Sequence, residues 1–522
     1  MSTRMQPLYV LSSDSQRTSG GDAQSSNIRA GKAVASAVRT TLGPRGMDKM
    51  LVDSQGNVVV TNDGATILAE MDIEHPAAQM IVEVAQTQEE SVGDGTTTAS
   101  VLTGELLTYA EDLLDDDLHP TVIVEGYHEA ARLAQEAIDE QVLDAALDDD
   151  LLRSVAESSM TGKGTGDVTA DVLAGHVVDA VRAVHDGSGR FDHDDVRVLT
   201  RTGASSSATE LVEGVVVDEE RVREGMPRTV EDATVAVLTT KLDIREGESD
   251  AEYTISSVDQ LEAAIEAEDA ELAGYADALA DAGVDVLFCT KSIADRVADR
   301  LARHGILAFD SVKSSDAKAV ARATGAKQLG DVKDLDAADF GRAERISIRR
   351  FGEDELTFVE GGDAAKTVTL LLRGGTEHVV DELERAITDA VDVTVAAIDS
   401  GGVVPGAGAT EVAIAEYVRS HAGGIRGRKQ LAVEAFADAV EALPRTLATN
   451  TGMDPIDAVV ELRSTFDREG VAGIISEGRT GAIGDPVEAG VLDPAAVKRE
   501  AITAATEAAT MIVRIDDVIA AN

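Results

Sequence analysis

The stretch GDGTTT, residues 93–98, stands between two helical patterns and decides how the rest of the chain is interpreted. After it, apolar residues recur every three or four positions as far as Leu113, the spacing of one buried helix face. The two glycines therefore flank Asp94 at a helix N-terminus, where free backbone N–H groups and the helix dipole favour an anion. Asp94 adds a hard carboxylate of the kind that binds Mg²⁺. A helix simply capped by Asp94 would explain the same residues, so a phosphate site needs support from elsewhere in the chain.

The length and composition indicate a folded protein of several domains. A chain of 522 residues is too long for one core, and two to four domains are expected. Aromatic residues make up only 3% and Trp is absent, so Ala, Val, Leu and Ile must fill the cores. The single cysteine, Cys289, excludes an intrachain disulfide and a metal site built from several cysteines. No apolar run approaches the ~18 residues of a membrane span, and residues 1–24 are polar rather than signal-like. We expect a soluble, cytoplasmic protein with no membrane partner.

The net charge is the strongest anomaly of the composition. There are 96 acidic and 46 basic residues, which gives −50. A polyanionic partner needs a basic footprint that no segment supplies, so we expect no nucleic acid partner. Apolar periodicity runs through most of the chain, which favours a folded protein covered with carboxylates over disorder. Such self-repulsion is tolerated where salt shortens the Debye length to ~3 Å at 1 M, so the composition indicates a halophile.

Both ends of the chain are mainly helical in pattern. A short apolar run at 8–11 suggests a lone strand, and a helix from Ile28 ends at Gly43-Pro44. The further elements expected are a hairpin of 50–52 with 58–61, helices at 76–90, 96–114, 120–147, 379–395, 429–443 (ended by Pro444), 456–466 and 497–511, and a strand at 515–519. We expect the two ends to fold together.

The middle of the chain, residues 214–373, has a different pattern. Strand-like runs at 234–238, 284–289, 305–309 and 367–372 alternate with helical runs at 294–303 and 316–324. This is typical of βαβ units with a parallel sheet, and a hairpin of 345–351 with 356–359 closes the domain. The acidic helix pattern at 258–279 has a narrow apolar stripe, so we expect it to project from the domain.

Three other places carry residues suited to phosphate chemistry. Asp63 leaves a strand in the turn NDG, where a turn former alone would explain it. Lys163 lies between glycines in ESSMTGKGTG, residues 157–166, and is either a point charge for a phosphate or a solvated loop residue. No GxxxxGK[ST] pattern exists, so Lys163 is not a P-loop lysine. The stretch GGVVPGAG, residues 401–408, is a second glycine-rich turn before a helix and is weak evidence for a nucleotide.

Several blocks together resemble the group II chaperonins, the archaeal thermosome type. They are LGPRGMDKMLVD (42–53), TNDGATIL (61–68), HPAA (75–78), GDGTTT (93–98), GTEHVVDELERA (375–386) and RIDDVI (514–519). The similarity runs in one order from about residue 6 to 521, nearly the whole chain.

The resemblance implies a multidomain α and α/β chaperonin fold. A mainly helical equatorial ATP-binding domain would take residues 1–147 and 401–522, and a small intermediate hinge domain 148–213 and 374–400. An α/β apical substrate-binding domain would take 214–373, with a helical lid protrusion at about 243–282. Members form double rings, so the implied partners are other chaperonin subunits, eight or nine per ring, and unfolded proteins. Short strands near Tyr9 and Val518 match terminal strands that pair across subunits.

The resemblance also implies an ATP-dependent chaperone that closes its lid on ATP hydrolysis, with ATP and Mg²⁺ as cofactors and K⁺ as a further candidate ion. Asp94 matches the Mg²⁺-binding aspartate, and Asp63 and Asp389 match two carboxylates that activate the attacking water. Lys163 matches a lysine that senses the γ-phosphate. Since Asp389 lies in the segment assigned to the intermediate domain, hydrolysis should require that domain to move onto the equatorial site. The other nucleotide-contacting positions implied are Leu42, Gly43, Pro44, Gly95, Thr96, Thr97, Thr98, Gly406, Gly408 and Asp493.

Some features depart from this pattern or leave alternatives. Ala407 stands where many members have glycine, and its methyl group is expected to crowd the base. The acidic and histidine residues at 185–186 and 192–194 imitate a metal site, but a solvated acidic loop explains them. One alternative function is a structural or substrate-binding subunit of a mixed ring that hydrolyses ATP weakly. Another is an unrelated Mg²⁺-dependent phosphotransferase, which the missing P-loop disfavours.

Overall fold

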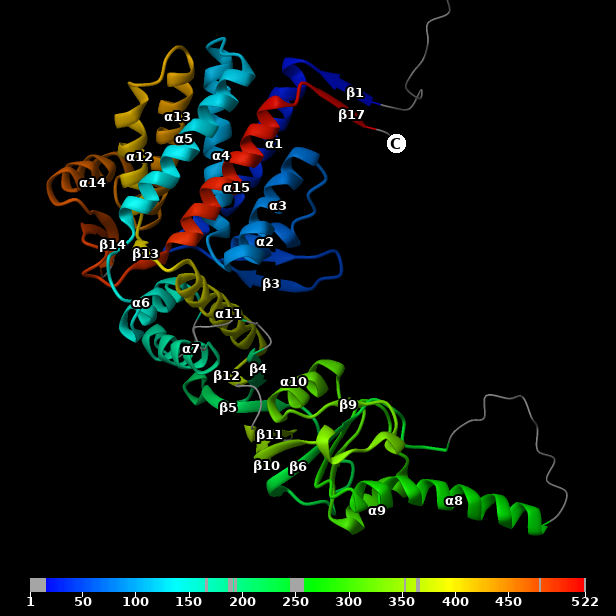
Figure 1. Ribbon diagram of the computed structural model, residues 1–522. Helices are drawn as coiled ribbons and strands as arrows, with labels where there is room; N and C mark the ends of the chain where they lie inside the picture. The colour runs from blue at the N-terminus through cyan, green and yellow to red at the C-terminus, as the bar shows by residue number, and fades with distance from the viewer. Residues whose placement is uncertain are drawn as a thin grey trace, which may run out of the picture. The chain divides into compact units, whose positions relative to one another are not determined.

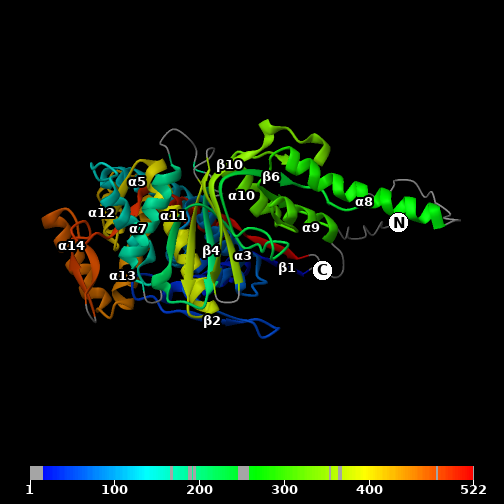
Figure 2. The ribbon, with the colours of Figure 1, turned by 90° about the horizontal axis from the view of Figure 1, so that it is seen from below.

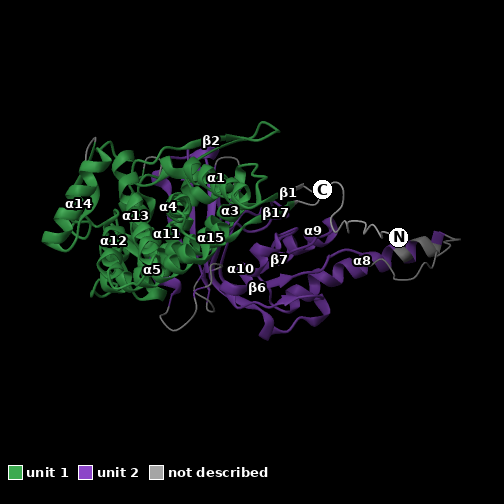
Figure 3. Cartoon of the chain, turned by 90° about the horizontal axis from the view of Figure 1, so that it is seen from above, with its two compact units in different colours: residues 1–178, 381–522 green, residues 179–380 purple. Residues whose placement is uncertain are grey.

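The computed structural model describes residues 16–164, 168–185, 191, 195–244, 258–351, 354–362, 367–477 and 480–520. The chain divides into two compact units, the first of residues 1–178 and 381–522 and the second of residues 179–380 (Figure 3). The two ends of the chain therefore share one unit, as their helical patterns indicated. The finer division into three domains stays a prediction.

The first unit is a helical bundle around α4 (Figure 1). This helix packs against α1, α3, α13 and α15, and its Leu102 and Leu106 are fully buried. Small aliphatic side chains fill the core, and Tyr127 meets Phe436 edge to face at 5.9 Å between ring centroids. The helices are α1 (Gly21–Val38), α2 (Gly64–Glu70), α3 (Pro76–Val92), α4 (Thr96–Asp115), α5 (Pro120–Gln141), α6 (Asp149–Met160), α12 (Ala409–Ala422), α13 (Lys429–Asn450), α14 (Pro455–Glu469) and α15 (Ala495–Arg514), with α7 (Ala170–Val184) and α11 (Glu377–Ser400) beside the two chain crossings between units.

Helix boundaries follow local signals at several places. His75 and Asp454 accept hydrogen bonds from the first turns of α3 and α14, and a proline follows each of them at the first helical position. The helix expected from Ile28 becomes α1 followed by a 3₁₀ turn, Arg39–Thr41. Helix α5 ends earlier than predicted because the chain beyond it pairs elsewhere: the Leu143 N–H donates to the Val403 carbonyl at 2.9 Å.

The prediction that Pro444 ends a helix is wrong. Helix α13 continues through it to Asn450, and Pro444 itself is buried. A proline inside a helix costs roughly 3 kcal/mol through the lost hydrogen bond and a ring clash. Here the residues on both sides of it, Leu443 and Thr446, are buried, and α13 packs against α4, α5 and α12. Burial along the whole helix outweighs the local penalty.

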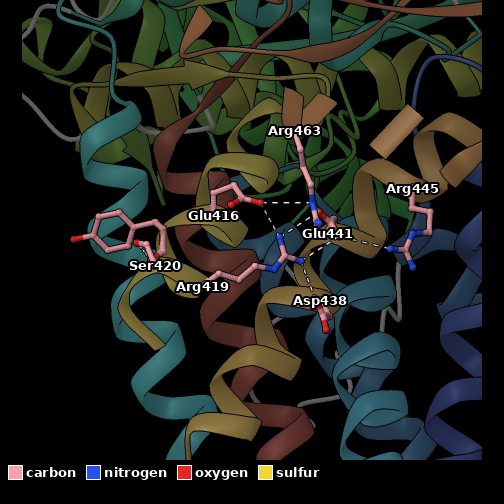
Figure 4. Close-up of polar contacts among 8 residues, drawn as sticks. Glu416, Arg419, Ser420, Asp438, Glu441, Arg445 and Arg463 are labelled. Carbon is pink, nitrogen blue, oxygen red and sulfur yellow. Dashed lines mark hydrogen bonds and ion pairs between the residues drawn. The ribbon is translucent and has the colours of Figure 1, made fainter. Parts of the chain in front are cut away.

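A network of charged side chains ties α12, α13 and α14 together (Figure 4). Glu441 on α13 is 2% exposed and accepts hydrogen bonds from Arg419 at 3.1 Å and from Arg463 at 2.6 Å. Arg445 lies 3.6 Å from the same carboxylate. Several of the few basic residues of this acidic chain therefore neutralise one buried carboxylate, because an unpaired charge there would be costly.

Four two-stranded ribbons complete the first unit. They pair β1 (Gln16–Ser19) with β17 (Asp517–Ala520), β2 (Lys49–Val52) with β3 (Val58–Thr61), β13 (Val403–Pro405) with β16 (Leu492–Pro494), and β14 (Gly473–Glu477) with β15 (Thr480–Gly484). The hairpin predicted at residues 50–61 is confirmed as β2 and β3. The strand near Val518 pairs with Gln16–Ser19 of the same chain, whereas the run at 8–11 lies outside the described residues. Pairing of these strands across subunits stays a prediction.

The second unit is built on a mixed sheet (Figure 2). Its order is β4-β12-β5-β11-β10-β6-β7-β8, with β9 also paired to β6. The strands β6, β7 and β8 are parallel, as the βαβ pattern predicted, and the hairpin predicted from residues 345–351 and 356–359 is confirmed as β10 and β11. The strand β5, which the sequence pattern did not predict, runs antiparallel to β11 and β12. The strands are β4 (Val196–Thr202), β5 (Glu210–Val217), β6 (Thr229–Leu238), β7 (Val286–Cys289), β8 (Leu307–Phe309), β9 (Gln328–Leu329), β10 (Gly341–Phe351), β11 (Asp354–Gly362) and β12 (Val368–Gly374), and the helices are α8 (Val258–Asp281), α9 (Asp295–His304) and α10 (Ser314–Thr324).

Helix α8 has two different halves. Leu272, Ala276 and Leu279 are buried against the second unit's core, whereas Val258 and Ile265 nearer the start of the helix are exposed. This agrees with a helix that leaves the domain surface; residues 245–257, also assigned to the lid protrusion, lie outside the described residues. Among the helices that the structure describes, none is long and apolar enough to span a membrane.

Candidate functional site

A cavity of about 380 Å³ lies within the first unit. Its walls come from the loop before β2, the N-terminal ends of α4 and α12, the loop after α6, and β14 to α15. Two of the residues singled out from the sequence, Asp389 and Gly406, are not part of its wall. The others all line it: Leu42, Gly43, Pro44, Asp63, Asp94, Gly95, Thr96, Thr97, Thr98, Lys163, Gly408 and Asp493.

The GDGTTT stretch forms a loop that delivers free N–H groups to this cavity. Gly95 precedes α4 at a φ of 84°, and no side chain caps the helix. Asp94 accepts a hydrogen bond from the Gly95 N–H at 2.7 Å, so Asp94 does not cap the helix itself. Buried Gln88 holds the loop from behind, because its Nε2 donates to the Asp94 carbonyl at 2.7 Å. The first turn of α4 therefore keeps unpaired N–H donors of the kind that bind anions.

Asp63 faces the same helix end. Its Oδ2 caps α2 by accepting from the Thr66 N–H at 2.6 Å, so the local structural role of Asp63 is that of a helix cap rather than of a turn former. Its Oδ1 accepts from the Thr96 hydroxyl at 3.1 Å. The cap thus fixes a carboxylate beside the first residue of α4.

Lys163 and Asp389 form a buried ion pair next to these groups. The Lys163 ammonium donates to Asp389 Oδ2, and the two side chains are 15% and 8% exposed. Burial raises the pKa of Asp389 to about 7, although Lys163 opposes this increase and Asp94 adds to it. Burial would lower the pKa of Lys163, but the charges of Asp389 and Asp94 outweigh it and the pKa lies above its ordinary value. Asp389 is thereby held beside the cavity through Lys163.

The loop that carries Lys163 is held by a residue that sequence reasoning missed. Asn62 Nδ2 donates to the Gly162 carbonyl at 2.7 Å, and a Cβ on Gly162 would lie 3.2 Å from the carbonyl oxygens of Gly43 and Pro44. Asn450, also missed, donates to the Leu42 carbonyl at 2.9 Å. Asn62 is next to Asp63 in the NDG turn, and this position was a signal that it belongs to the site. Asn450 is the last residue of α13, and no local sequence pattern marks it.

The cavity wall holds a second lysine, Lys498. Its Nζ lies 2.8 Å from Glu411 Oε1 and 2.8 Å from Asp493 Oδ2. Gly406 lies behind this group, since a Cβ there would come within 3.1 Å of the Asp493 carboxylate. Ala407 lines the cavity with φ of 57°, in the left-handed region that favours glycine.

The ionisable groups near Lys163 are mostly acidic, which favours binding of a cation beside them. Burial and the charges of Asp389, Asp63 and Asp94 raise the pKa of Glu89 to about 9, so Glu89 is neutral at pH 7. Asp63 and Asp94 stand beside the Lys163–Asp389 pair, and hard carboxylate oxygens of this kind suit Mg²⁺ that is shared with phosphate. Among the described residues, no group of three or more His, Cys, Asp or Glu side chains is arranged to hold a metal ion by itself, at this site or at another, so phosphate oxygens would have to complete the coordination here. Residues 186 and 192–194 lie outside the described residues.

A helical unit formed by both chain ends, a cavity with a glycine-rich anion loop and an inserted α/β unit together define a chaperonin type of subunit. The sequence profile of the TCP-1/cpn60 chaperonin family matches residues 34–522, and the chain belongs to this family. This confirms the multidomain α and α/β fold class, and the family implies nucleotide binding.

The relatives are thermosome subunits of archaea. The chain is 77% identical to "Thermosome subunit 3" of Haloferax volcanii over 100% of both chains. It is 52% identical to "Thermosome subunit alpha" of Halobacterium salinarum, covering 99% of this chain and 92% of that one. It is also 52% identical to "Thermosome subunit" of Methanopyrus kandleri, covering 99% and 95%. The resemblance to the archaeal thermosome type and the halophilic character read from the charge are confirmed.

Proposed function

We propose that this chain is an ATP-hydrolysing chaperonin subunit whose cavity in the first unit is the ATP site. The observation that carries the proposal is the convergence of Asp63, Asp94, Lys163 and Asp389, four distant parts of the sequence, around the N-terminal end of α4. Three carboxylates and a lysine beside unpaired helix N–H groups suit a triphosphate with its metal better than they suit a neutral ligand.

Each residue has a definite task in this proposal. The N–H groups and hydroxyls of residues 96–98 bind the phosphate oxygens, and Asp94 holds Mg²⁺. Bound Mg²⁺ would offset negative charge on the phosphates. Asp63 and Asp389 orient a water molecule in line with the γ-phosphorus and accept its proton.

The ion pair of Lys163 and Asp389 gives the site a way to sense the γ-phosphate. In this structure each side chain is the other's partner. When a γ-phosphate enters, its oxygens compete for the Lys163 ammonium, and Asp389 becomes available to the attacking water. Motion of the α11 segment relative to the rest of the site would then couple hydrolysis to lid closure.

The sugar and base occupy the other end of the cavity. Asp493 accepts hydrogen bonds from the ribose hydroxyls, and Gly406 and Gly408 lie on the adenine side. The loop of Leu42, Gly43 and Pro44 covers the nucleotide. K⁺ is a further ion of the proposed site, and no residue is assigned to it.

The chain is proposed to act in the cytoplasm within a double ring of eight or nine subunits per ring that encloses unfolded protein. Haloferax volcanii has relatives named subunit 1 and subunit 3, which supports rings of more than one kind of subunit. A weakly hydrolysing structural subunit of a mixed ring is the alternative function; family membership leaves an unrelated phosphotransferase without support.

The test is ATP hydrolysis in concentrated KCl by the purified chain and by Asp63→Ala and Asp389→Ala. We expect each variant to hydrolyse ATP at least ~100-fold more slowly while ATP binding persists. Asp399→Ala, which changes an exposed carboxylate on the same helix as Asp389, is the control and should retain the full rate. Equal rates in all variants would refute the carboxylate assignment. Negligible turnover by the unaltered chain, with rings visible in negative stain, would favour the structural alternative.

A further inference from the structure

Lys498 is an ion bridge between three parts of the chain. Its side chain, on α15, is 12% exposed, and its Nζ contacts Glu411 in the first turn of α12 and Asp493 on β16 at 2.8 Å each. The Glu411 side chain is 6% exposed and the Asp493 side chain is 28% exposed. All three residues line the cavity.

Asp493 and Glu411 each have one carboxylate oxygen in contact with Lys498 and one oxygen without a hydrogen-bond donor among the described residues. Lys498 takes Oδ2 of Asp493, and among the described residues no other donor bonds the Asp493 side chain, so Oδ1 is left as an acceptor. Glu411 Oε2 is buried and has no hydrogen-bond partner in the described structure. Burying a carboxylate with one oxygen that accepts no hydrogen bond costs free energy. The contact of Glu411 Oε1 with the Lys498 ammonium offsets part of this cost.

The charges of the three groups sum to one negative charge. Burial would lower the pKa of Lys498, but the charges of Asp493 and Glu411 outweigh it, so the pKa lies above its ordinary value and the ammonium stays charged. Without it, the two carboxylates would repel each other and Asp493 would lose the contact that fixes its orientation. With it, Asp493 keeps a defined orientation and a charged acceptor oxygen.

We propose that Lys498 and Glu411 are positioning residues that give the site its specificity for nucleotides with a complete ribose. Lys498 fixes Asp493 by Oδ2 so that Oδ1 accepts from the vicinal sugar hydroxyls, and Glu411 keeps Lys498 in place. The inference rests on the proposed ATP site, because it requires a nucleotide in this cavity. It predicts a loss of sugar discrimination, not of phosphate binding, when the bridge is removed.

The test compares the affinities of Mg²⁺–ATP and Mg²⁺–2′,3′-dideoxyATP in concentrated KCl for the unaltered chain and for Lys498→Met, Lys498→Arg and Glu411→Gln. A hydrogen bond to a charged acceptor is worth enough to give the unaltered chain a roughly ten- to hundredfold preference for ATP. In Lys498→Met we expect this preference to fall below about threefold, with the dideoxyATP affinity nearly unchanged. Lys498→Arg should restore part of the preference, and Glu411→Gln should give an intermediate value.

A merely structural bridge would behave differently. If Lys498→Met weakened ATP and dideoxyATP by the same factor, the positioning role would be overturned. The affinities of the unaltered chain also test the inference, and this test does not depend on whether a variant folds. Equal affinity for ATP and dideoxyATP would overturn the inference but would not contradict the proposed ATP site. Binding of neither nucleotide would overturn the proposed function as well.

A matched control removes another interhelical lysine. Lys32 on α1 pairs with Glu111 on α4 at 2.7 Å and does not line the cavity. Lys32→Met should leave the preference for ATP over dideoxyATP unchanged. A loss of preference in this variant equal to that of Lys498→Met would mean that general loosening of the bundle, and not the bridge, controls discrimination.

Discussion

Two lysines border the same cavity in contrasting ways. Lys163 lies on the loop after α6 and has one carboxylate partner, Asp389, whereas Lys498 lies within α15 and bridges two carboxylates. Side chains on helices are held more rigidly than those on loops. The comparison favours different roles for the two lysines: Lys163 would change partners when a γ-phosphate arrives, and Lys498 would stay fixed beside the sugar.

We expect the largest effect when each of the two lysines is replaced by Met, because the two changes should alter different kinetic constants. Lys163→Met should lower kcat for ATP hydrolysis by about 100-fold, the usual loss when a donor to developing charge is removed, with a smaller change in KM. Lys498→Met should raise KM for ATP with kcat within about threefold of the unaltered chain. Steady-state rates in concentrated KCl measure both. Identical changes in kcat and KM for the two variants would remove the distinction.

The pH dependence of hydrolysis should follow Asp389. Because burial raises the pKa of Asp389 to about 7 and a base must be ionised, kcat/KM should fall about tenfold per pH unit below that value and level off above it. Lys163 lowers the pKa of Asp389, so Lys163→Gln should move the residual profile upward by about one pH unit. A profile in Lys163→Gln that stays in place or moves to lower pH would contradict the coupling.

The stability of the folded chain should also depend on pH, through Glu89 near Lys163. Burial raises the pKa of Glu89 from 4.5 to about 9, so between these values the unfolded chain releases a proton that the folded chain keeps. The free energy of unfolding should therefore decrease as pH rises through this range. Glu89→Gln, which imitates the protonated acid, should raise Tm by about 1–3 °C at pH 8 and leave it unchanged at pH 4. Thermal unfolding at the two pH values measures this, and a lower Tm at pH 8 would show that Glu89 is ionised.

The smallest effect concerns Ala407, which lines the same cavity. Its φ of 57° costs about 1–2 kcal/mol for a residue other than glycine, and a glycine would add about 0.4–1 kcal/mol of unfolded-state entropy. Ala407→Gly should therefore stabilise by between about 0 and 1.6 kcal/mol and change ATP affinity by less than about threefold. Denaturant unfolding and nucleotide titration measure the two effects. A large gain in affinity would mean that the Ala407 methyl group obstructs the base.

Local patterns predicted the parts of this molecule whose signals are local. The GDGTTT turn, the hairpin before Asp63 and the capped starts of α3 and α14 follow from residues close in sequence. The glycine-rich loop at 157–166 marked Lys163 as a candidate phosphate contact. The role of Asp389 came only from the family resemblance, since 226 positions separate it from Lys163 and no periodicity links them.

What was missed depends on burial. Lys498, in the run VKRE, looks like a residue of a solvated helix face, and only the packing of α15 against α4 and α5 makes it a buried bridge. Pro444 was taken as a stop because its cost is local while the compensating burial is not. The order of the strands in the second unit was not predicted, because it depends on pairing partners rather than on the residues of each strand.

The central claim is that Asp94 and the first turn of α4 hold the metal-bound triphosphate. Its most direct test is the ATP affinity of the unaltered chain and of Asp94→Ala, measured in concentrated KCl with Mg²⁺ and with excess chelator. We predict that Mg²⁺ tightens ATP binding by the unaltered chain and has no such effect on Asp94→Ala. The same Mg²⁺-dependent increase in affinity in both proteins would contradict the account.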